Sequence, residues 1–170
     1  MANTLTINVA KFLLDFDIEK AESLVNPTKN GSVKEWGRAL AHGTGLNQAD
    51  LIHWDERTLA ASGNETLDLS ALSNTFGTVN LARVKLLAVR LEYGSTQASS
   101  IQVGGAAATP FVSHLGGTTP TYRVRNGGFV AFFAPDATAY VAGAANNLKI
   151  VNNDASNSAI YQIVIAGSSA

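Results

Sequence analysis

The sequence predicts an all-β fold, an antiparallel β-sandwich that is jelly-roll-like and carries an extended N-terminal arm. From about Leu81 onward, apolar residues come in short runs separated by Gly, Asn, Ser and Pro, which is typical of antiparallel strands and turns. No long segment with the apolar period of a helix separates these runs, which favours a sandwich, jelly roll or barrel. The 170 residues suffice for one domain, so we predict a sandwich at residues 43–170 and an arm or accessory strands at 1–42.

The N-terminal third is the least regular part of the sequence. Residues 4–9 alternate as a strand does, whereas residues 17–24 have the pattern of one or two helical turns. Residues 32–35 imitate a helix capping box, but we discount a helix there because Gly37 interrupts it and so short a segment gains little without a packed face. We therefore expect residues 1–42 to lie along the sandwich or along a neighbouring subunit.

The sandwich strands are predicted from apolar residues at every second position and from the turns between them. Asn126-Gly127-Gly128 accepts positive φ angles at low cost, so the segments on either side of it are predicted to form a β-hairpin. The last strand is expected in the interior of its sheet, after a polar turn at residues 152–157. The expected strands span residues 82–93, 100–103, 121–125, 129–133, 148–150 and 160–165.

The composition limits the classes of partner. Lys and Arg total 12 against 13 Asp and Glu, and the net charge of -1 creates no field that attracts a polyanion or an anionic membrane. We expect no nucleic acid as a partner. Charged residues make up 15% of the chain, below the roughly 25% of typical domains, and such a surface suits repeated contact with other subunits. The absence of Cys excludes disulfides, thiolate zinc sites and a Cys nucleophile.

The sequence has neither the pattern of a secretory signal nor that of a membrane-spanning helix. The first residues lack the basic and apolar regions of a secretory signal, so we expect synthesis in the cytoplasm. The most apolar stretch, residues 129–145, is interrupted by Pro135, Asp136 and Gly143, and it is shorter than the roughly 20 residues of a spanning helix. We therefore expect no membrane partner.

Few residues are candidates for metal binding. His53 and Asp55 lie two apart, hence on one face of a strand, and could ligate a metal together with His114. The alternative, which we favour, is that Asp55 pairs with Arg57 or caps a turn while Trp54 faces the core. Asp15 and Asp17 could likewise hold a cation, but we interpret them as part of a half-exposed strand or turn. No metal or cofactor is predicted.

Catalytic patterns are equally sparse. Glu65 and Asp68 are the nearest carboxylate pair for glycosidase chemistry, but nothing marks either as desolvated, so we predict structural roles. Three Gly-Gly pairs occur, at residues 104–105, 116–117 and 127–128. None is followed by Lys-Ser or Lys-Thr, so we interpret them as turn glycines and not as a phosphate loop. No Gly-x-Ser-x-Gly elbow is present. We predict that the protein is not an enzyme.

One concentration of basic residues lies near Tyr93 and Tyr122 and could bind nucleic acid, with the aromatic rings stacking on bases. The near-neutral net charge of the chain instead favours contact with an acidic patch on a protein partner. The basic residues are Arg83, Lys85, Arg90, Arg123 and Arg125. Trp residues are enriched in binding hot spots and are also ordinary core residues. Both alternatives remain open for the two Trp residues. The candidate interface residues are Trp36, Trp54, Tyr122, Arg123 and Arg125.

A set of short motifs spread from Ala39 to Gly167 is similar to a recurrent type of small structural protein of tailed bacteriophages and prophages. The motifs are Ala39-Leu40, Gly43-Thr44-Gly45, Gln48-Ala49-Asp50, Asp55, Arg57-Thr58-Leu59, Leu67-Asp68-Leu69, Phe76-Gly77, Val84-Lys85 and Tyr161-Gln162-Ile163-Val164-Ile165-Ala166-Gly167. The central block is distinctive, whereas a C-terminal strand with Gly occurs in many β proteins.

The resemblance implies a virion protein, and among virion roles we favour a capsid decoration protein, also called a head auxiliary or cement protein, on the outer surface of the capsid. It implies a jelly-roll-like fold, a homo-oligomer that is most often a trimer, and the major capsid protein or other virion proteins as partners. The alternative is a tail- or fibre-associated structural protein that binds carbohydrate or a receptor. That alternative needs an exposed aromatic platform, for which Tyr122, Tyr140 and Trp54 are candidates.

Overall fold

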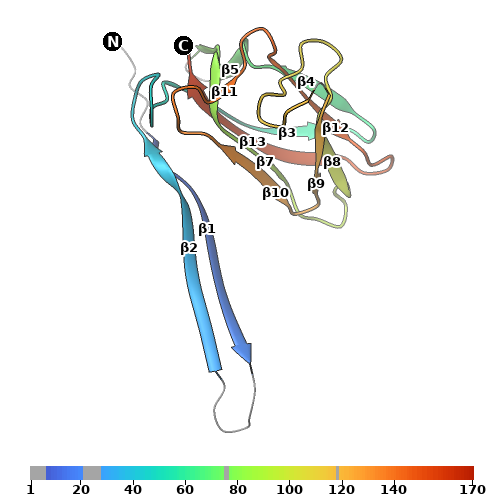
Figure 1. Cartoon of the computed structure of the whole chain (residues 1–170). Coiled ribbons are helices and arrows are strands. Elements are labelled where there is room, and N and C mark those ends of the chain that lie inside the picture. The colour runs from blue at the N-terminus through green and yellow to red at the C-terminus, as the bar shows by residue number, and fades with distance from the viewer. Residues whose placement is uncertain (1–6, 21–27, 75–76, 118) are drawn as a thin grey trace.

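The computed structural model describes residues 7–20, 28–74, 77–117 and 119–170. Two antiparallel sheets pack face to face, a small two-stranded sheet lies beside them, and a long hairpin precedes them (Figure 1). Every regular element within the described residues is a strand, and none of them contains a helix long and apolar enough to cross a membrane. The prediction of an all-β, antiparallel, sandwich-like fold is confirmed.

The first sheet has five strands in the order β10-β7-β13-β3, with β11 pairing beyond the end of β10 along β7. The second has the order β4-β12-β8-β9. Strand β13 lies between β7 and β3, so the prediction of an interior C-terminal strand is confirmed. The first sheet consists of β3 (Leu51–Leu59), β7 (Arg83–Leu91), β10 (Phe129–Phe133), β11 (Tyr140–Val141) and β13 (Ala159–Ser168). The second consists of β4 (Asn64–Asp68), β8 (Ser100–Gly104), β9 (Thr121–Arg125) and β12 (Asn147–Asn152).

The core lies between the two sheets and is built from alternate residues of each strand. Ile163 on β13 and Ile150 on β12 are both 0% exposed, at the centres of opposite sheets. Each such side chain contributes roughly 1.5–3 kcal/mol relative to an exposed position. The other inward residues include Leu87, Val89, Leu91, Ile101, Val103, Leu148 and Ile165.

Strand β7 matches the predicted strand at residues 82–93 in most of its length, but it ends at Leu91. Tyr93, at the end of the predicted strand, lies beyond β7 and is 84% exposed. Its ring lies against Gly127, where any β-carbon would come within 2.9 Å of it. At the other end of β7, a bulge brings Gly167 so close to the carbonyl oxygen of Arg83 that a side chain there would collide with it.

The predicted hairpin of residues 121–125 and 129–133 is wrong in its pairing, although both strands exist. Strand β9 pairs with β8 and strand β10 pairs with β7, so they belong to opposite sheets. The turn between them is tight, with Gly127 at a φ of 74°. Val124 and Val130 both pack toward the core, and a connection from one sheet to the other lets both strands bury their inward residues.

The N-terminal hairpin pairs β1 (Ile7–Lys20) with β2 (Thr28–Leu40) in antiparallel register. The predicted strand at 4–9 is present at residues 7–9, and its first residues lie outside the described part. Helical turns at 17–24 are wrong for residues 17–20, which belong to β1, and residues 21–24 lie outside the described part. Cross-strand hydrogen bonding supplies partners for the backbone that an isolated helical turn would leave unpaired.

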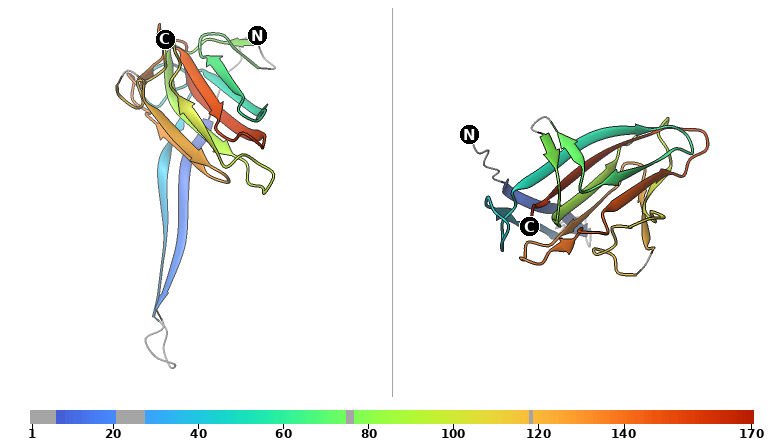
Figure 2. Two further views of the ribbon diagram at one scale, coloured as in Figure 1. Left: turned by 90° about the vertical axis from the view of Figure 1, so that its right-hand side faces the viewer. Right: turned by 90° about the horizontal axis from the view of Figure 1, so that it is seen from above.

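Figure 1 and the left view of Figure 2 show this hairpin pointing away from the sandwich. The chain joins the sandwich at Leu40, which is 1% exposed, and at Ala41, whose backbone bonds to Asn47 and Ala49. Two short strands, β5 (Leu72–Asn74) and β6 (Gly77–Val79), complete the described fold.

Candidate interaction surface

The outer face of the first sheet carries an exposed apolar row. The register places Trp54 opposite Val164, Val164 opposite Ala88, and Ala88 opposite Ala131, so the row crosses β3, β13, β7 and β10. Trp54 is 64% exposed, and Ala131 at the other edge is also exposed. We call these four residues the outer apolar row.

The rows on either side differ in polarity. One neighbouring row includes Leu86 and Phe133, which are half-buried and apolar. The other is polar on β3, β13 and β7: Gln162 Nε2 donates to Glu56 Oε2 at 2.9 Å, and Gln162 lies opposite Arg90. At β10 this row ends in Phe129, which lies opposite Arg90 and is 56% exposed. The apolar row is therefore bounded by polar groups at β3, β13 and β7, and the exposed apolar area extends to Phe129 at β10.

The prediction that Trp54 faces the core is wrong. Because side chains alternate along a strand, only one of the two sets on β3 can face the second sheet. His53 is 2% exposed and takes the inward side together with Leu59, which leaves Trp54 outside. Burial lowers the pKa of His53, while the charge of Asp55 and a hydrogen bond with the backbone of Ser73 act in the opposite direction.

Asp55 forms the predicted pair with Arg57, with 2.9 Å between Asp55 Oδ2 and Arg57 Nε. Arg57 Nη1 also binds Glu65 Oε2 at 2.6 Å, and the hydroxyl of Tyr161 donates to Glu65 Oε1 at 2.6 Å. Burial opposes the charge on Arg57, but its hydrogen bond and ion pair with Glu65 outweigh burial and raise its pKa. Glu65 thus links the two sheets, which is the structural role predicted for it.

The second residue of the predicted carboxylate pair is also structural. Asp68 Oδ1 accepts from the backbone N–H of Ser70 and from the side-chain amide of Asn146, each at 2.9 Å. These bonds join the end of β4 to the loop before β12. Among the described residues, no group of three or more His, Asp or Glu side chains is arranged to hold a metal ion.

His114 lies in an aromatic cluster and not beside His53. Its ring stacks on Phe111 with 4.7 Å between centroids and packs edge-on against Phe132 at 4.8 Å. Burial lowers the pKa of His114 to about 4, and neither of its nitrogens has a hydrogen-bond partner. Tyr122 and Tyr140 belong to the same cluster, and burial raises the pKa of Tyr122, whose hydroxyl is enclosed.

The five basic residues of the predicted concentration do not form one surface. Lys85 is 0% exposed, and its ammonium donates to the carbonyl oxygens of Gly45, at 3.1 Å, and Asp136. Arg90 is exposed on the outer face of the first sheet. Arg123 and Arg125 are exposed on β9, an edge strand of the second sheet, while Tyr122 and Val124, which alternate with them, point inward.

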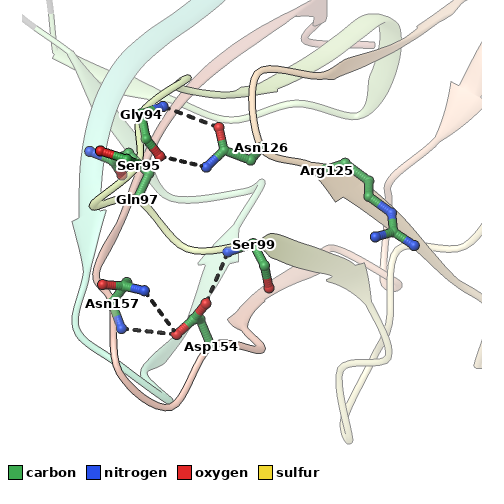
Figure 3. Close-up of a pocket in the computed structure, with 8 residues that line it drawn as sticks. All are labelled: Gly94, Ser95, Gln97, Ser99, Arg125, Asn126, Asp154 and Asn157. Carbon is green, nitrogen blue, oxygen red and sulfur yellow. Dashed lines mark hydrogen bonds between the residues drawn. The ribbon is translucent and has the colours of Figure 1, made fainter.

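Loops at one end of the sandwich form a shallow polar pocket of about 470 Å³ (Figure 3). Asn126 bonds to both backbone groups of Gly94, and Asp154 accepts backbone N–H donors from Ser99, Ser156 and Asn157. Those donors lower the pKa of Asp154 to about 2. The lining residues are Gly94, Ser95, Gln97, Ser99, Arg125, Asn126, Asp154 and Asn157.

Of the candidate interface residues, the structure therefore exposes Trp54, Arg123 and Arg125 on outer faces and turns Tyr122 inward. The side chain of Trp36 lies outside the described residues. Sequence reasoning missed the outer apolar row, because Ala88, Ala131 and Val164 become neighbours only through strand pairing. The apolar runs at 86–89 and 129–133 were the available signal, since both faces of each strand are apolar there.

No protein-family model matches the chain, and no curated protein matches it. A function is therefore argued from the residues and from their arrangement.

Proposed function

We propose that this protein is a non-enzymatic virion structural protein, a decoration or cement subunit that binds the outer surface of a tailed-phage capsid and stabilises it. The observation that carries the proposal is the exposed outer apolar row, a contact surface on a subunit whose own core is already complete. The motif resemblance from Ala39 to Gly167 supplies the class of partner, which is the major capsid protein or another virion protein.

The sandwich topology supports a jelly roll. Along the chain, β3, β7, β10 and β13 belong to the first sheet and β4, β8, β9 and β12 to the second. Strands that are distant in sequence lie side by side, as β3 does with β13 and β4 with β12. Apart from the two-residue strand β11, the two sheets contain eight strands, and eight strands with such connections are typical of jelly rolls, which are common in viral capsid proteins.

A structural role agrees with how the titratable side chains are used. Glu65 binds both Arg57 and Tyr161, and Lys85 binds backbone carbonyl groups. His114 packs among aromatic rings. Each of these groups has a role in the fold, and together they do not form an acid, a base and a nucleophile around one cleft.

The proposed mechanism is mass action. A subunit that binds the assembled lattice, and not its separate proteins, stabilises that lattice by the free energy of binding. A homo-oligomer, with a trimer favoured, multiplies weak contacts through avidity. We assign the contacts to the outer apolar row, to the β1–β2 hairpin as an arm and to the exposed Arg123 and Arg125, which can meet an acidic patch.

The test is co-sedimentation of the purified protein with undecorated, expanded capsids of the phage that encodes it. We expect saturable binding at a fixed number of copies per capsid. We expect Arg123→Gln with Arg125→Gln to weaken it, while Arg83→Gln on β7 with Lys149→Gln on β12 removes the same two positive charges away from β9 and serves as the charge-matched control. No saturable binding, or equal binding to free capsid protein and to the lattice, would overturn the proposal.

A second candidate function is binding of a carbohydrate receptor, because one exposed aromatic residue lies beside the polar pocket. Tyr93 is 84% exposed and next to Gly94 of the pocket rim, and an aromatic face beside Asn, Asp and Arg groups suits a sugar ring. Tyr122 and Tyr140, two of the three residues predicted for an exposed aromatic platform, lie instead in the aromatic cluster around His114. Binding to a glycan array that Tyr93→Ala abolishes would favour this function, and no binding would exclude it for the glycans tested.

A further inference from the structure

The side chain of Asn126 ties the turn between β9 and β10 to the loop that follows β7. Its Oδ1 accepts the backbone N–H of Gly94 at 3.1 Å, and its Nδ2 donates to the carbonyl oxygen of Gly94 at 2.8 Å (Figure 3). The Nδ2 group also donates to the carbonyl oxygen of Ala98 at 3.3 Å. An amide suits this position because it combines an acceptor for the N–H with donors for the two carbonyl groups. We call residues 93–99, which Asn126 holds in this way, the Tyr93 loop.

The residue after Asn126 is a glycine for a structural reason. Gly127 has a φ of 74°, a conformation that residues with a β-carbon rarely adopt, and a β-carbon there would come within 2.9 Å of the Tyr93 side chain. The fold therefore places an Asn-Gly pair in this turn. Asn is a chemically labile residue, and a following Gly makes it more so, because no side chain hinders attack by the Gly backbone nitrogen.

The reaction of an Asn-Gly pair needs only the chain and water. The backbone nitrogen of Gly127 forms a bond to Cγ of Asn126, the bond between Cγ and Nδ2 breaks, and ammonia leaves with the proton of the Gly127 nitrogen. The product is a cyclic succinimide. Water then opens this ring at Cγ, which gives Asp, or at the backbone carbonyl carbon, which gives isoaspartate.

The folded Tyr93 loop hinders the first step. Attack on Cγ turns the planar amide of Asn126 into a tetrahedral centre, which displaces Oδ1 and Nδ2 from their hydrogen bonds to Gly94 and Ala98. Reaction in the folded protein therefore loses these bonds as the barrier is crossed. Local opening of the loop removes that obstacle, so the rate of deamidation depends on how often the loop opens.

The products cannot replace the amide. An ionised carboxylate has acceptors only, so the carbonyl oxygens of Gly94 and Ala98 would face an acceptor in place of a donor. Isoaspartate also lengthens the backbone of a turn that is closed by a 2.7 Å hydrogen bond from Gly128 N–H to the carbonyl oxygen of Arg125. Either product loosens the Tyr93 loop, whose residues line part of the polar pocket.

We propose that Asn126 is a spontaneous modification site, at which deamidation is a one-way switch that loosens the Tyr93 loop and takes apart the polar pocket. The switch is one-way because the ammonia is lost to the solvent. The proposal goes beyond capsid binding and involves no other protein, so the purified full chain is sufficient to test it.

The first experiment measures the rate of deamidation at mildly alkaline pH by mass spectrometry of proteolytic peptides. Asn30-Gly31, the other Asn-Gly pair of the sequence, is the internal reference. We expect Asn126 to react about tenfold more slowly in the folded protein than in guanidinium chloride. Equal rates at Asn126 in the folded and the unfolded protein would overturn the proposal.

A variant that loosens the loop without touching Asn126 sharpens this test. Gln97 Oε1 accepts the backbone N–H of Ile160 at 2.8 Å and so holds the same loop. We expect Gln97→Ala to speed deamidation at Asn126 in the folded protein and to leave the rate at Asn30 unchanged. An unchanged rate at Asn126 in Gln97→Ala would overturn the role of loop opening.

The second experiment examines the product through the variant Asn126→Asp. We expect chymotrypsin to cleave after Tyr93 about tenfold faster in this variant than in the unmodified protein, because the loosened loop opens more often. The matched control is Asn153→Asp, which makes the same change of charge at an exposed position between β12 and β13. Equal cleavage of the two variants would overturn the proposal. If Asn126→Asp does not fold, the deamidation rates of the unmodified chain and of Gln97→Ala still decide it.

Discussion

The sandwich and the N-terminal hairpin differ in the number of β layers that they contain. Both consist of antiparallel strands with alternating apolar residues. In the sandwich, two sheets cover one another, and residues such as Ile163 and Ile150 reach 0% exposure. The hairpin is a single two-stranded layer that points away from those sheets (Figure 1). The described strands place no second sheet against this layer.

We therefore expect different parts of the molecule to determine the stability of the subunit and its association with other subunits. The free energy of unfolding of the sandwich is expected to depend on contacts within the subunit. Contacts of the hairpin and of the outer apolar row are expected to determine association. The following predictions test that separation, from the largest expected change in the free energy of unfolding to the smallest.

The largest effect is expected from Ile163→Ala at the centre of β13. Removing a fully buried aliphatic side chain leaves a cavity and lowers the free energy of unfolding by roughly 2–5 kcal/mol. Urea unfolding of the purified protein measures it. Leu14→Ala in the hairpin is the comparison, and we expect it to leave the unfolding of the sandwich unchanged. Equal destabilisation by both substitutions would show that the hairpin is part of the cooperative unit.

Lys85→Met is expected to cost roughly 1–3 kcal/mol, because it leaves the carbonyl oxygens of Gly45 and Asp136 without their buried donor. Burial lowers the pKa of Lys85, but its donors are present at pH 7. Arg83→Met is the control, since Arg83 is only half-buried and donates once, to the carbonyl oxygen of Thr138. A smaller loss for Lys85→Met than for Arg83→Met would contradict the proposed role of Lys85 in joining the two loops.

The pH dependence tests His114. Its pKa is about 4 in the folded protein and near 6.5 in the unfolded chain, so only the unfolded chain takes up this proton between those values. The free energy of unfolding should therefore fall as the pH drops from 6.5 to 4, by roughly 2 kcal/mol. His53, whose pKa is also lowered, acts in the same direction.

We expect His114→Phe to flatten this slope while it keeps the aromatic packing, as measured by urea unfolding at pH 7, 5.5 and 4.5. Asp154 does not contribute to this slope. Its pKa is lowered from 3.8 to about 2 in the folded protein, so it stabilises the fold above pH 3.8, and that contribution is lost only as the pH falls below 3.8. An unchanged slope in His114→Phe would show that other groups cause the acid sensitivity.

The smallest effect on unfolding is expected from deletion of residues 1–36. The cut retains Leu40, which is buried, and Ala41, which bonds to Asn47 and Ala49. We expect the free energy of unfolding of the sandwich to change by less than about 0.5 kcal/mol, as for surface changes. Sedimentation velocity of the same protein should show loss of the oligomer. A persistent oligomer would remove the hairpin from its interface.

Several features of the fold were predictable from the sequence for local reasons. The strands at 100–103 and 160–165 were found because their alternation and flanking turn residues are local signals. The Asp55–Arg57 pair was found because residues two apart share a strand face. Errors arose where pairing partners decide the outcome, as for β9 and β10, which are adjacent in sequence and pair in opposite sheets.

The candidate interaction surface was also predictable only in part from the sequence. Trp54 and Arg123 could be named from their residue types, but the inward or outward direction of a strand residue depends on which face meets the other sheet. For β3 that choice turned His53 inward and Trp54 outward, and for β9 it turned Tyr122 inward. The sequence by itself determined an all-β chain with short strands, few charges and no Cys, since period, turns and composition are local properties. Only the tertiary structure decided which strands pair and which apolar residues stay exposed, because both depend on contacts between residues that are distant in sequence.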